Sequence, residues 1–385
     1  MKIYKNKILL NTLIILLILI LNCGCTNHSN LTKYNDNLYE LTYRDYNDEE
    51  VIKINKKTSN SNNPNNSDNE LIYTKSHIGS ILYTNNIYGR SYDNIYNNNV
   101  EFIIRTKKTK NRYSSISING GLEELNTNLL NKELSNEIYN ILPYLVLDGI
   151  NEKGVFVSLL TIPSNNNYPT TNKKTNLLIN QLIPKYVLDN CKSSKDAIDK
   201  LSKKNIYNQD IFDINKNNLD FQYIIGDSKN QYVVQFINNE MVYTKSNIVT
   251  NYSLLNNNND ENNNDNKNNI GIERYNLINN NINNIKDIYD TLNLLEKLKY
   301  SNSTNTLNEE FWYSEHLGIY NNNYYNNDNI KSIKDDLFKI IIDNNINTNY
   351  KTIYASSYDL NNKRLSISLS EDYETIYQFY LTILY

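Results

Sequence analysis

The stretch LVLDGINEKGVFVSLLTIP, residues 145–163, decides how the rest of the chain is interpreted. Two apolar runs, at 144–149 and 155–162, enclose the polar connection INEKG. This pattern predicts two buried strands joined by a tight turn, in which the glycines supply unusual backbone angles. We expect the turn to be shaped by Asp148, Gly149, Asn151, Glu152 and Gly154.

Short strand-like runs continue on both sides of this stretch. ILYT, NIYGR, EFIIRT and YSSISI precede it, and FQYIIGD, QYVVQFI, EMVYTK and the last 35 residues follow it. Asn85-Asn86 predicts a hairpin turn, because Asn tolerates a positive φ. Helical spacing of apolar residues occurs at 174–191, 194–203 and 285–298. Strands and helices that do not alternate regularly favour a layered α+β fold over a doubly wound parallel sheet.

Composition limits the classes of partner and divides the chain. Lys and Arg are dispersed and the formal net charge is −3, so we expect no nucleic acid partner. Residues 26–79 are polar and rich in Asn and Ser, which predicts a linker or pro-segment. The main domain then fills residues 80–385. Within it, NNNNDENNNDNKNN at 256–269 has no apolar residue and predicts a solvated loop.

Residues 1–25 have the pattern of a targeting signal. Three lysines within the first seven residues precede an apolar run, and small residues follow where a signal peptidase could cut. We therefore predict an exported protein, secreted or extracellular. Two alternatives involve the membrane: a lipoprotein anchored through Cys25, and an uncleaved signal that stays as an anchor.

The cysteines exclude two common frameworks. Cys23 and Cys25 lie at the processing site, which leaves Cys191 alone in the mature chain. One cysteine can form neither an internal disulfide nor a Cys-based zinc site, so we expect no metal. Cys191 falls in a helical pattern and is interpreted as a small buried apolar residue.

Five motifs, in order, resemble those of the choloylglycine hydrolase family of linear amide C–N hydrolases. LDGINEKG resembles the family's DGMNEKG; YGRSYDN (88–94) resembles GRNxD; NIVTN (247–251) resembles xVTN; GIERY (271–275) supplies a later Arg; and residues 352–373 resemble the closing strands with their YDL pattern. Together the motifs span residues 77–382. The family includes bile salt hydrolases, penicillin V acylases and relatives of acyl-CoA:penicillin acyltransferase.

The resemblance implies an α+β, four-layer αββα N-terminal-nucleophile hydrolase fold. In such enzymes the first residue of the mature chain attacks the amide carbonyl, and its own α-amino group is the general base. That amine titrates near pH ~8, close to working pH. The motifs place Arg90 beside the nucleophile, and they assign Asp93 to hydrogen-bond and orient the α-amino group. They assign Asn251 to the oxyanion hole and Arg274 to the family's later Arg, with a salt-bridged surface Arg as the alternative for Arg274. Thr161 and Asn151 fall in the substrate-pocket and oxyanion region.

The family nucleophile is Cys, and no Cys lies near Arg90. If Asn85-Asn86 is the hairpin turn, residue 80 or 81 lies opposite Arg90. We therefore predict Ser80 as the nucleophile, released by self-cleavage after Gly79, a residue whose backbone tolerates strain. The alternative is an ordinary strand serine in a chain that has lost its catalytic residue.

These assignments predict an exported amidase that cleaves N-acylated small molecules: bile-salt conjugates, penicillin V or other N-acyl amines. The resemblance implies no metal or organic cofactor and is compatible with a homo-oligomer. The alternative from another class is an inactive family member, exported or lipid-anchored, that binds an acyl ligand.

Overall fold

The computed structural model describes the chain in segments. They are residues 31–46, 72–73, 78–95, 100–120, 122–123, 136–162, 176–207, 220–237, 240–251, 270–298, 350–369 and 372–381. The predicted signal at 1–25 and the loop at 256–269 lie outside these residues, as does most of the 26–79 segment.

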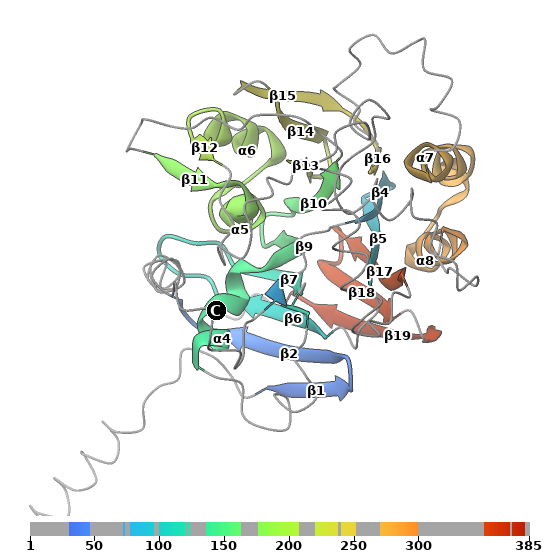
Figure 1. Cartoon of the computed structure of the whole chain (residues 1–385), viewed down its shortest axis with the longest axis horizontal. Coiled ribbons are helices and arrows are strands. Elements are labelled where there is room, and N and C mark those ends of the chain that lie inside the picture. The colour runs from blue at the N-terminus through green and yellow to red at the C-terminus, as the bar shows by residue number, and fades with distance from the viewer. Residues whose placement is uncertain are drawn as a thin grey trace, which may run out of the picture.

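One sheet has nine strands in the order β1-β2-β6-β7-β9-β10-β13-β14-β15 (Figure 1). Its strands are β1 Thr32–Asn35, β2 Leu38–Tyr43, β6 Glu101–Thr106, β7 Ser115–Asn119, β9 Val146–Asn151, β10 Phe156–Ile162, β13 Asp220–Gly226, β14 Gln231–Ile237 and β15 Glu240–Lys245. Every pairing in this sheet is antiparallel except that of β2 with β6. The two apolar runs of the 145–163 stretch form β9 and β10 and pair as predicted.

A second sheet has six antiparallel strands in the order β16-β4-β5-β17-β18-β19. They are β4 Ile78–Thr84, β5 Ile87–Ile95, β16 Ile248–Thr250, β17 Tyr350–Asp359, β18 Arg364–Leu369 and β19 Asp372–Tyr380. Two small pairs complete the strands: β3 Ile72–Tyr73 with β8 Leu122–Glu123, and β11 Leu177–Ile179 with β12 Asn205–Tyr207.

Helices cover the outer face of each sheet (Figure 1). Helices α5 Ile183–Asn190 and α6 Ser194–Leu201 pack on the nine-stranded sheet. Helix α4 Asn136–Ile141 and a 3-10 turn at Leu142–Tyr144 pack with β2 and β6 of the same sheet. Helices α7 Ile270–Asn281 and α8 Ile288–Lys297 pack on the six-stranded sheet. Further 3-10 turns are Asn180–Leu182 and Ile282–Asn284. The described elements therefore stack as helix, sheet, sheet and helix.

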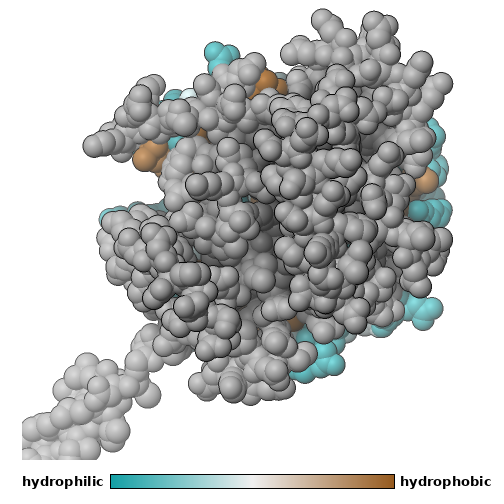
Figure 2. Space-filling model, viewed as in Figure 1, coloured by the Kyte–Doolittle hydropathy of each residue, from teal (hydrophilic) through white to brown (hydrophobic). Residues whose placement is uncertain are grey.

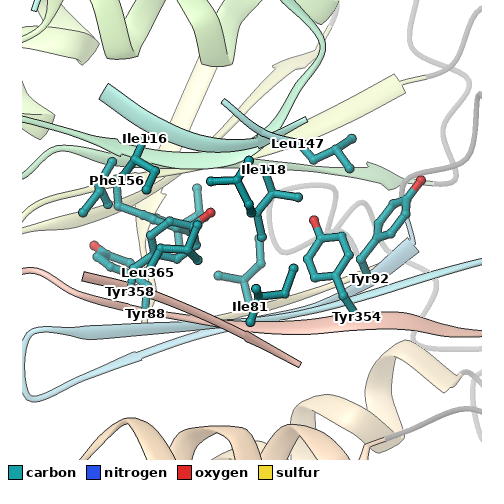
Figure 3. Close-up of a cluster of buried hydrophobic side chains, with 14 of the residues drawn as sticks. Ile81, Tyr88, Tyr92, Ile116, Ile118, Leu147, Phe156, Tyr354, Tyr358 and Leu365 are labelled. Atoms are coloured by element: carbon teal, nitrogen blue, oxygen red, sulfur yellow. The ribbon is translucent and has the colours of Figure 1, made fainter. Parts of the chain in front are cut away.

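The inner faces of the two sheets meet in an apolar and aromatic layer (Figure 3). Ile116, Ile118, Leu147 and Phe156 enter it from one sheet, and residues such as Tyr354 from the other. On the outside, Figure 2 shows hydrophilic side chains along the rim where α7 and α8 lie in Figure 1. No helix within the described segments is long and apolar enough to cross a membrane.

Two expectations from the sequence are corrected by these elements. The helix predicted over 174–191 begins only at Ile183, after a strand and a 3-10 turn, because Pro184 suits a first helical turn but cannot continue a helix from upstream. Residues 32–43, inside the segment interpreted as a polar linker, form β1 and β2 of the nine-stranded sheet. In LYELTY, Tyr39, Leu41 and Tyr43 alternate onto one buried face, and Leu38 is buried on the other. This short strand pattern is masked by the Asn-rich composition around it.

Candidate active site

The β4–β5 hairpin carries the predicted nucleophile segment and the predicted Arg. Asn85 and Asn86 form its turn with φ of 51° and 63°, as the sequence predicts for a two-residue hairpin. The strands pair Ser80 with Ser91 and Ile81 with Arg90. The predicted register is therefore confirmed.

The same register places Ser80 and Arg90 on opposite faces of the six-stranded sheet. Residues paired directly across two strands point to one face, and successive residues alternate. Arg90 shares its face with Ile81, which lies in the layer between the sheets. Ser80 shares its face with Leu82, which packs against α7 and α8. The prediction that Arg90 lies beside Ser80 is wrong. Ser80 pairs with Ser91, and Arg90, one residue away, points to the opposite face of the sheet.

Ser80 is fully buried on the helix-facing side. Its backbone nitrogen donates to Ser91 Oγ at 3.0 Å, and Thr250 is its register partner on β16. Its own Oγ has no hydrogen-bond partner among the residues that the structure describes. A buried hydroxyl without a partner costs about 1–3 kcal/mol, and such groups in native structures often mark a functional position.

Position 79 accepts only glycine. Its φ is +148°, and an added Cβ would lie 1.9 Å from the carbonyl oxygen of Ser91. Its nitrogen donates to Asn251 Oδ1 at 2.8 Å, and Asn251 Nδ2 donates to the Thr161 carbonyl at 2.7 Å. The structure thus links Gly79, Asn251 and Thr161 in one chain of hydrogen bonds. Gly79 precedes Ser80 in sequence, and Asn251 follows Thr250, the register partner of Ser80.

Asp93 and Arg274 form a buried ion pair. Arg274 on α7 reaches Asp93 Oδ2 with Nη1 and the Leu298 carbonyl with Nη2 at 3.2 Å. Thr352 donates its hydroxyl to Asp93 Oδ1 at 2.5 Å. Arg274 is only 7% exposed, so the surface alternative for this residue is wrong. Ser80 and the ion pair lie on the same face, although the Ser80 nitrogen binds Ser91 and not Asp93.

Arg90 lies in the layer between the sheets, with a counter-ion that the sequence did not suggest. Its Nη1 donates to the Leu147 carbonyl at 3.0 Å, to the Leu159 carbonyl at 2.9 Å and to Ser158 Oγ. Its Nε lies 3.3 Å from Asp148 Oδ2, and both side chains are 0% exposed. Burial raises the pKa of Asp148, while Arg90 and the hydroxyls of two tyrosines oppose the rise.

The tyrosines that bind Asp148 come from β17. Tyr354 donates to Oδ2 at 2.5 Å and Tyr358 donates to Oδ1 (Figure 3 shows both rings entering the layer). Glu101 is also fully buried nearby, and neither of its carboxylate oxygens has a partner among the residues described. Burial, and then the charge of Asp148, raise the pKa of Glu101 well above its ordinary value, against the effect of Arg90. We therefore describe Arg90, Asp148, Glu101, Tyr354 and Tyr358 as the inter-sheet charge cluster.

The turn predicted at INEKG is shorter than expected, and Asn151 is the last residue of β9, directly before it. Asp148 and Gly149 lie within β9; the turn itself is Glu152-Lys153, with Gly154 at φ +77°. Asn151 Nδ2 donates to the carbonyls of Leu188 and Cys191, and its Oδ1 accepts from the nitrogens of Lys153 and Val155. The placement of Asn151 in the oxyanion region is therefore wrong, because its amide is committed to joining the turn to α5.

Some partners of the site were missed for identifiable reasons. Ser91 follows from the predicted register, since it lies opposite Ser80. An Asp inside the apolar run LVLDG indicates a buried charge that needs a cation. Thr352 carries no such signal, because it depends on how two strands 259 positions apart in the chain pair. Within the described segments no group of three or more His, Cys, Asp or Glu could hold a metal ion.

This architecture, two facing sheets between helical layers, is the fold of the N-terminal-nucleophile hydrolases; Ser80, Arg90 and Asp93 lie on its β4–β5 hairpin. A variant of the conjugated bile acid hydrolase from Clostridium perfringens has the same fold, with a TM-score of 0.50 at 14% identity, over 79% of this chain and 92% of that chain. Penicillin V acylase from Agrobacterium tumefaciens gives a TM-score of 0.39 at 13% identity, over 79% and 86%. No curated protein sequence matches this chain.

Residues 80–254 match the family described as linear amide C-N hydrolases, choloylglycine hydrolase family. Over this region the chain is similar to that family, and the motifs at 88–94, 147–154 and 247–251 lie within it. The matched region begins at Ser80 and includes Arg90, Asp93, Thr161 and Asn251.

Proposed function

We propose that this protein is an exported amidase that hydrolyses linear C–N amide bonds of N-acylated small molecules, with Ser80 as a nucleophile released by self-cleavage after Gly79. The observation that carries the proposal is the Ser80 hydroxyl, fully buried and without a partner in the described residues, directly after a glycine at φ +148°. The family supports the class of reaction. The export part rests on the pattern of residues 1–25.

The first chemical event is the release of the Ser80 amine. Ser80 Oγ attacks the carbonyl carbon of Gly79, the Gly79–Ser80 C–N bond breaks, and an ester joins the two residues. Water then hydrolyses that ester, which leaves a carboxylate on Gly79 and a free α-amino group on Ser80. The amine can take the proton from its own hydroxyl in the next reaction, because it titrates near pH ~8.

Catalysis on a substrate repeats the same steps with a different acyl group. Ser80 Oγ attacks the amide carbon, the proton passes through the Ser80 amine to the leaving nitrogen, and water releases the acyl group from the ester. In the uncleaved chain the Gly79 nitrogen occupies Asn251 Oδ1. Withdrawal of Gly79 after cleavage would free this acceptor oxygen. For Asn251 to act as an oxyanion donor, its Nδ2 would also have to leave the Thr161 carbonyl, to which it donates at 2.7 Å; loss of one oxyanion donor costs roughly 3–4 kcal/mol.

A second candidate, an inactive member that binds an acyl ligand, is favoured by one specific observation. On the Arg90 face of the hairpin, the position next to Ile81 is Gly79, which has no side chain, and Ser80 points to the other face. A chain that keeps this arrangement would hold the family's frame without a nucleophile beside Arg90. The substrates named for the related structures, conjugated bile acids and penicillin V, are then candidate ligands.

N-terminal sequencing with intact mass, on full-length protein recovered from the medium or membrane fraction, separates the two. A chain that begins at Ser80 supports the amidase, and hydrolysis of bile-salt conjugates, penicillin V or other N-acyl amines then follows. Ser80→Ala should abolish cleavage, whereas Ser80→Cys should keep or raise it; Ser246→Ala, a partly buried serine on the β15–β16 connection, is the control. A chain that begins near Cys25 or Thr26 and hydrolyses none of these amides supports the binding protein.

A further inference from the structure

The segment at residues 31–46 lies before the proposed cleavage point and outside the region that matches the family. It is nevertheless built into the nine-stranded sheet. β2 pairs in parallel with β6 over six consecutive positions, from Leu38 with Glu101 to Tyr43 with Thr106. A self-cleaving precursor would therefore cut the chain between two strands of its own fold.

The inward side chains of this segment are buried in two different places. Tyr39, Leu41 and Tyr43 are at most 5% exposed and pack with residues of β6 and of the α4 region. Leu38, on the other face of β2, is fully buried in the layer between the sheets. Since an apolar side chain gains about 1.5–3 kcal/mol on full burial, removal of β2 would expose a large part of two cores.

β1 extends the contact to the second sheet. The Tyr34 ring meets the Phe379 ring edge-on, with centroids 5.1 Å apart, and Asn35 Nδ2 donates to Tyr377 Oη at 3.1 Å. The β6 residue Arg105 binds both Glu40 of β2 and the Tyr380 carbonyl of β19. The segment thus joins the edges of the two sheets.

Tyr46 fastens the end of the segment. Two cations lie over its ring: Nζ of Lys185, on α5, is 4.1 Å from the ring centroid, and Cζ of the Arg112 guanidinium is 4.2 Å from it. Its hydroxyl donates to Asp189 Oδ1 at 2.7 Å, and its carbonyl accepts from Arg112 Nη1 at 2.7 Å. Lys185 and Asp189 are themselves buried and paired at 2.6 Å. Desolvated cation–π contacts and charged hydrogen bonds are the strong members of their classes.

We propose that residues 31–46 are a permanent part of the folded protein, and that they stay bound non-covalently when the chain is cut between residue 46 and Ser80. The contact of Tyr46 with Lys185 and Arg112 is their anchor. The segment is a structural strand and not a pro-segment that leaves. This inference does not depend on self-cleavage, because a cut anywhere between residue 46 and Ser80 poses the same question.

The test introduces a recognition site for a sequence-specific protease into the Asn-rich stretch 58–70 of the full-length protein. After digestion, native size-exclusion chromatography with mass spectrometry shows whether the N-terminal fragment elutes with the rest. We expect co-elution in native buffer and separation only in denaturant. Separate elution of the fragment in native buffer, whether or not the remainder stays folded, would overturn the proposal.

Variants locate the anchor. Tyr46→Phe keeps the ring and loses the hydroxyl, and should release the fragment about 10-fold faster; Tyr46→Ala should release it about 100-fold faster or more. Lys33→Ala, whose side chain is 55% exposed on the same segment, should release it at the wild-type rate. Equal release rates for all three variants would refute the role of Tyr46, and the wild-type digestion would still decide retention.

Discussion

The inter-sheet charge cluster makes Asp148→Asn the most informative single substitution. The change keeps the shape of the side chain and removes the only ionised counter-charge that the structure describes in contact with the Arg90 guanidinium, at 3.3 Å with both groups 0% exposed. Removal of one member of a buried pair costs about 3–5 kcal/mol, because the remaining charge is left without compensation. That is a large part of a typical total stability of about 5–15 kcal/mol.

Glu101 should change its behaviour in this variant. In the wild type, burial and then the charge of Asp148 raise the pKa of the Glu101 carboxyl well above its ordinary value, which favours its protonated form. With Asp148 neutral, Glu101 loses that repulsion and keeps the attraction of Arg90, so its pKa should fall and it should become the new counter-ion. Glu101→Gln should therefore be harmless or stabilising at neutral pH in the wild type, and destabilising in the Asp148→Asn background.

A double-mutant cycle by urea and thermal unfolding measures this coupling. At about 2 °C per kcal/mol, the single variant should lower Tm by about 6–10 °C. Asp36→Asn is the matched control, since Asp36 pairs with Lys33 at 2.7 Å but is 88% exposed, and its change should leave Tm unchanged because solvent screens the pair. A loss below about 1 kcal/mol for Asp148→Asn, or the same effect of Glu101→Gln in both backgrounds, would refute the account of the cluster.

Three further outcomes follow from single residues. The folded state binds more protons at Glu101 than the unfolded state does, so wild-type stability should fall as pH rises above the ordinary carboxyl range. Glu101→Gln should reduce that fall, measured as Tm between pH 4 and pH 8, and Asp148, whose pKa burial also raises, should account for what remains. Gly226→Ala should cost about 1–3 kcal/mol in urea unfolding, because the new Cβ would lie 1.7 Å from Tyr88 Oη. Asn151→Ala should lower stability by about 2–4 kcal/mol through its four lost hydrogen bonds, and unchanged stability with lost activity would instead restore it to the site.

Much of the fold could be predicted because its signals are local. The Asn85-Asn86 turn, the β9–β10 pair and the closing strands each depend on patterns within about ten residues. The strand at 38–43 was missed because it lies in a polar segment and pairs with a strand some 60 positions away in the chain. Propensity says little about such a strand, since its stability comes from the partner and the core that it completes.

The candidate site was predicted as a set of residues but not as a geometry. Asn251 and Thr161, both assigned to the oxyanion region, are in contact, whereas the ion pair between Asp93 and Arg274 was not predicted. A bulge on β17 illustrates what the sequence could not give. Between Thr352 and Tyr354 the register shifts, so that Thr352 binds Asp93 while Tyr354 binds Asp148 on the other face. Without the extra residue, side chains two apart would share a face, and one of these carboxylates would lose its donor.

The period of two along β4 therefore decides what the site can do. Ser80 has the free hydroxyl, yet Arg90 lies across the sheet from it, and Gly79 cannot carry a side chain on the Arg90 face without a clash against Ser91. The alternation of side-chain direction along a strand constrains a residue only while peptide bonds hold it on both sides. Cleavage before Ser80 would make it a chain end, with its backbone no longer held by the peptide bond to Gly79, and Asn251 Oδ1 would lose the Gly79 nitrogen as its donor. For this chain, the proposed amidase and the proposed binding protein thus differ in whether the Gly79–Ser80 peptide bond breaks.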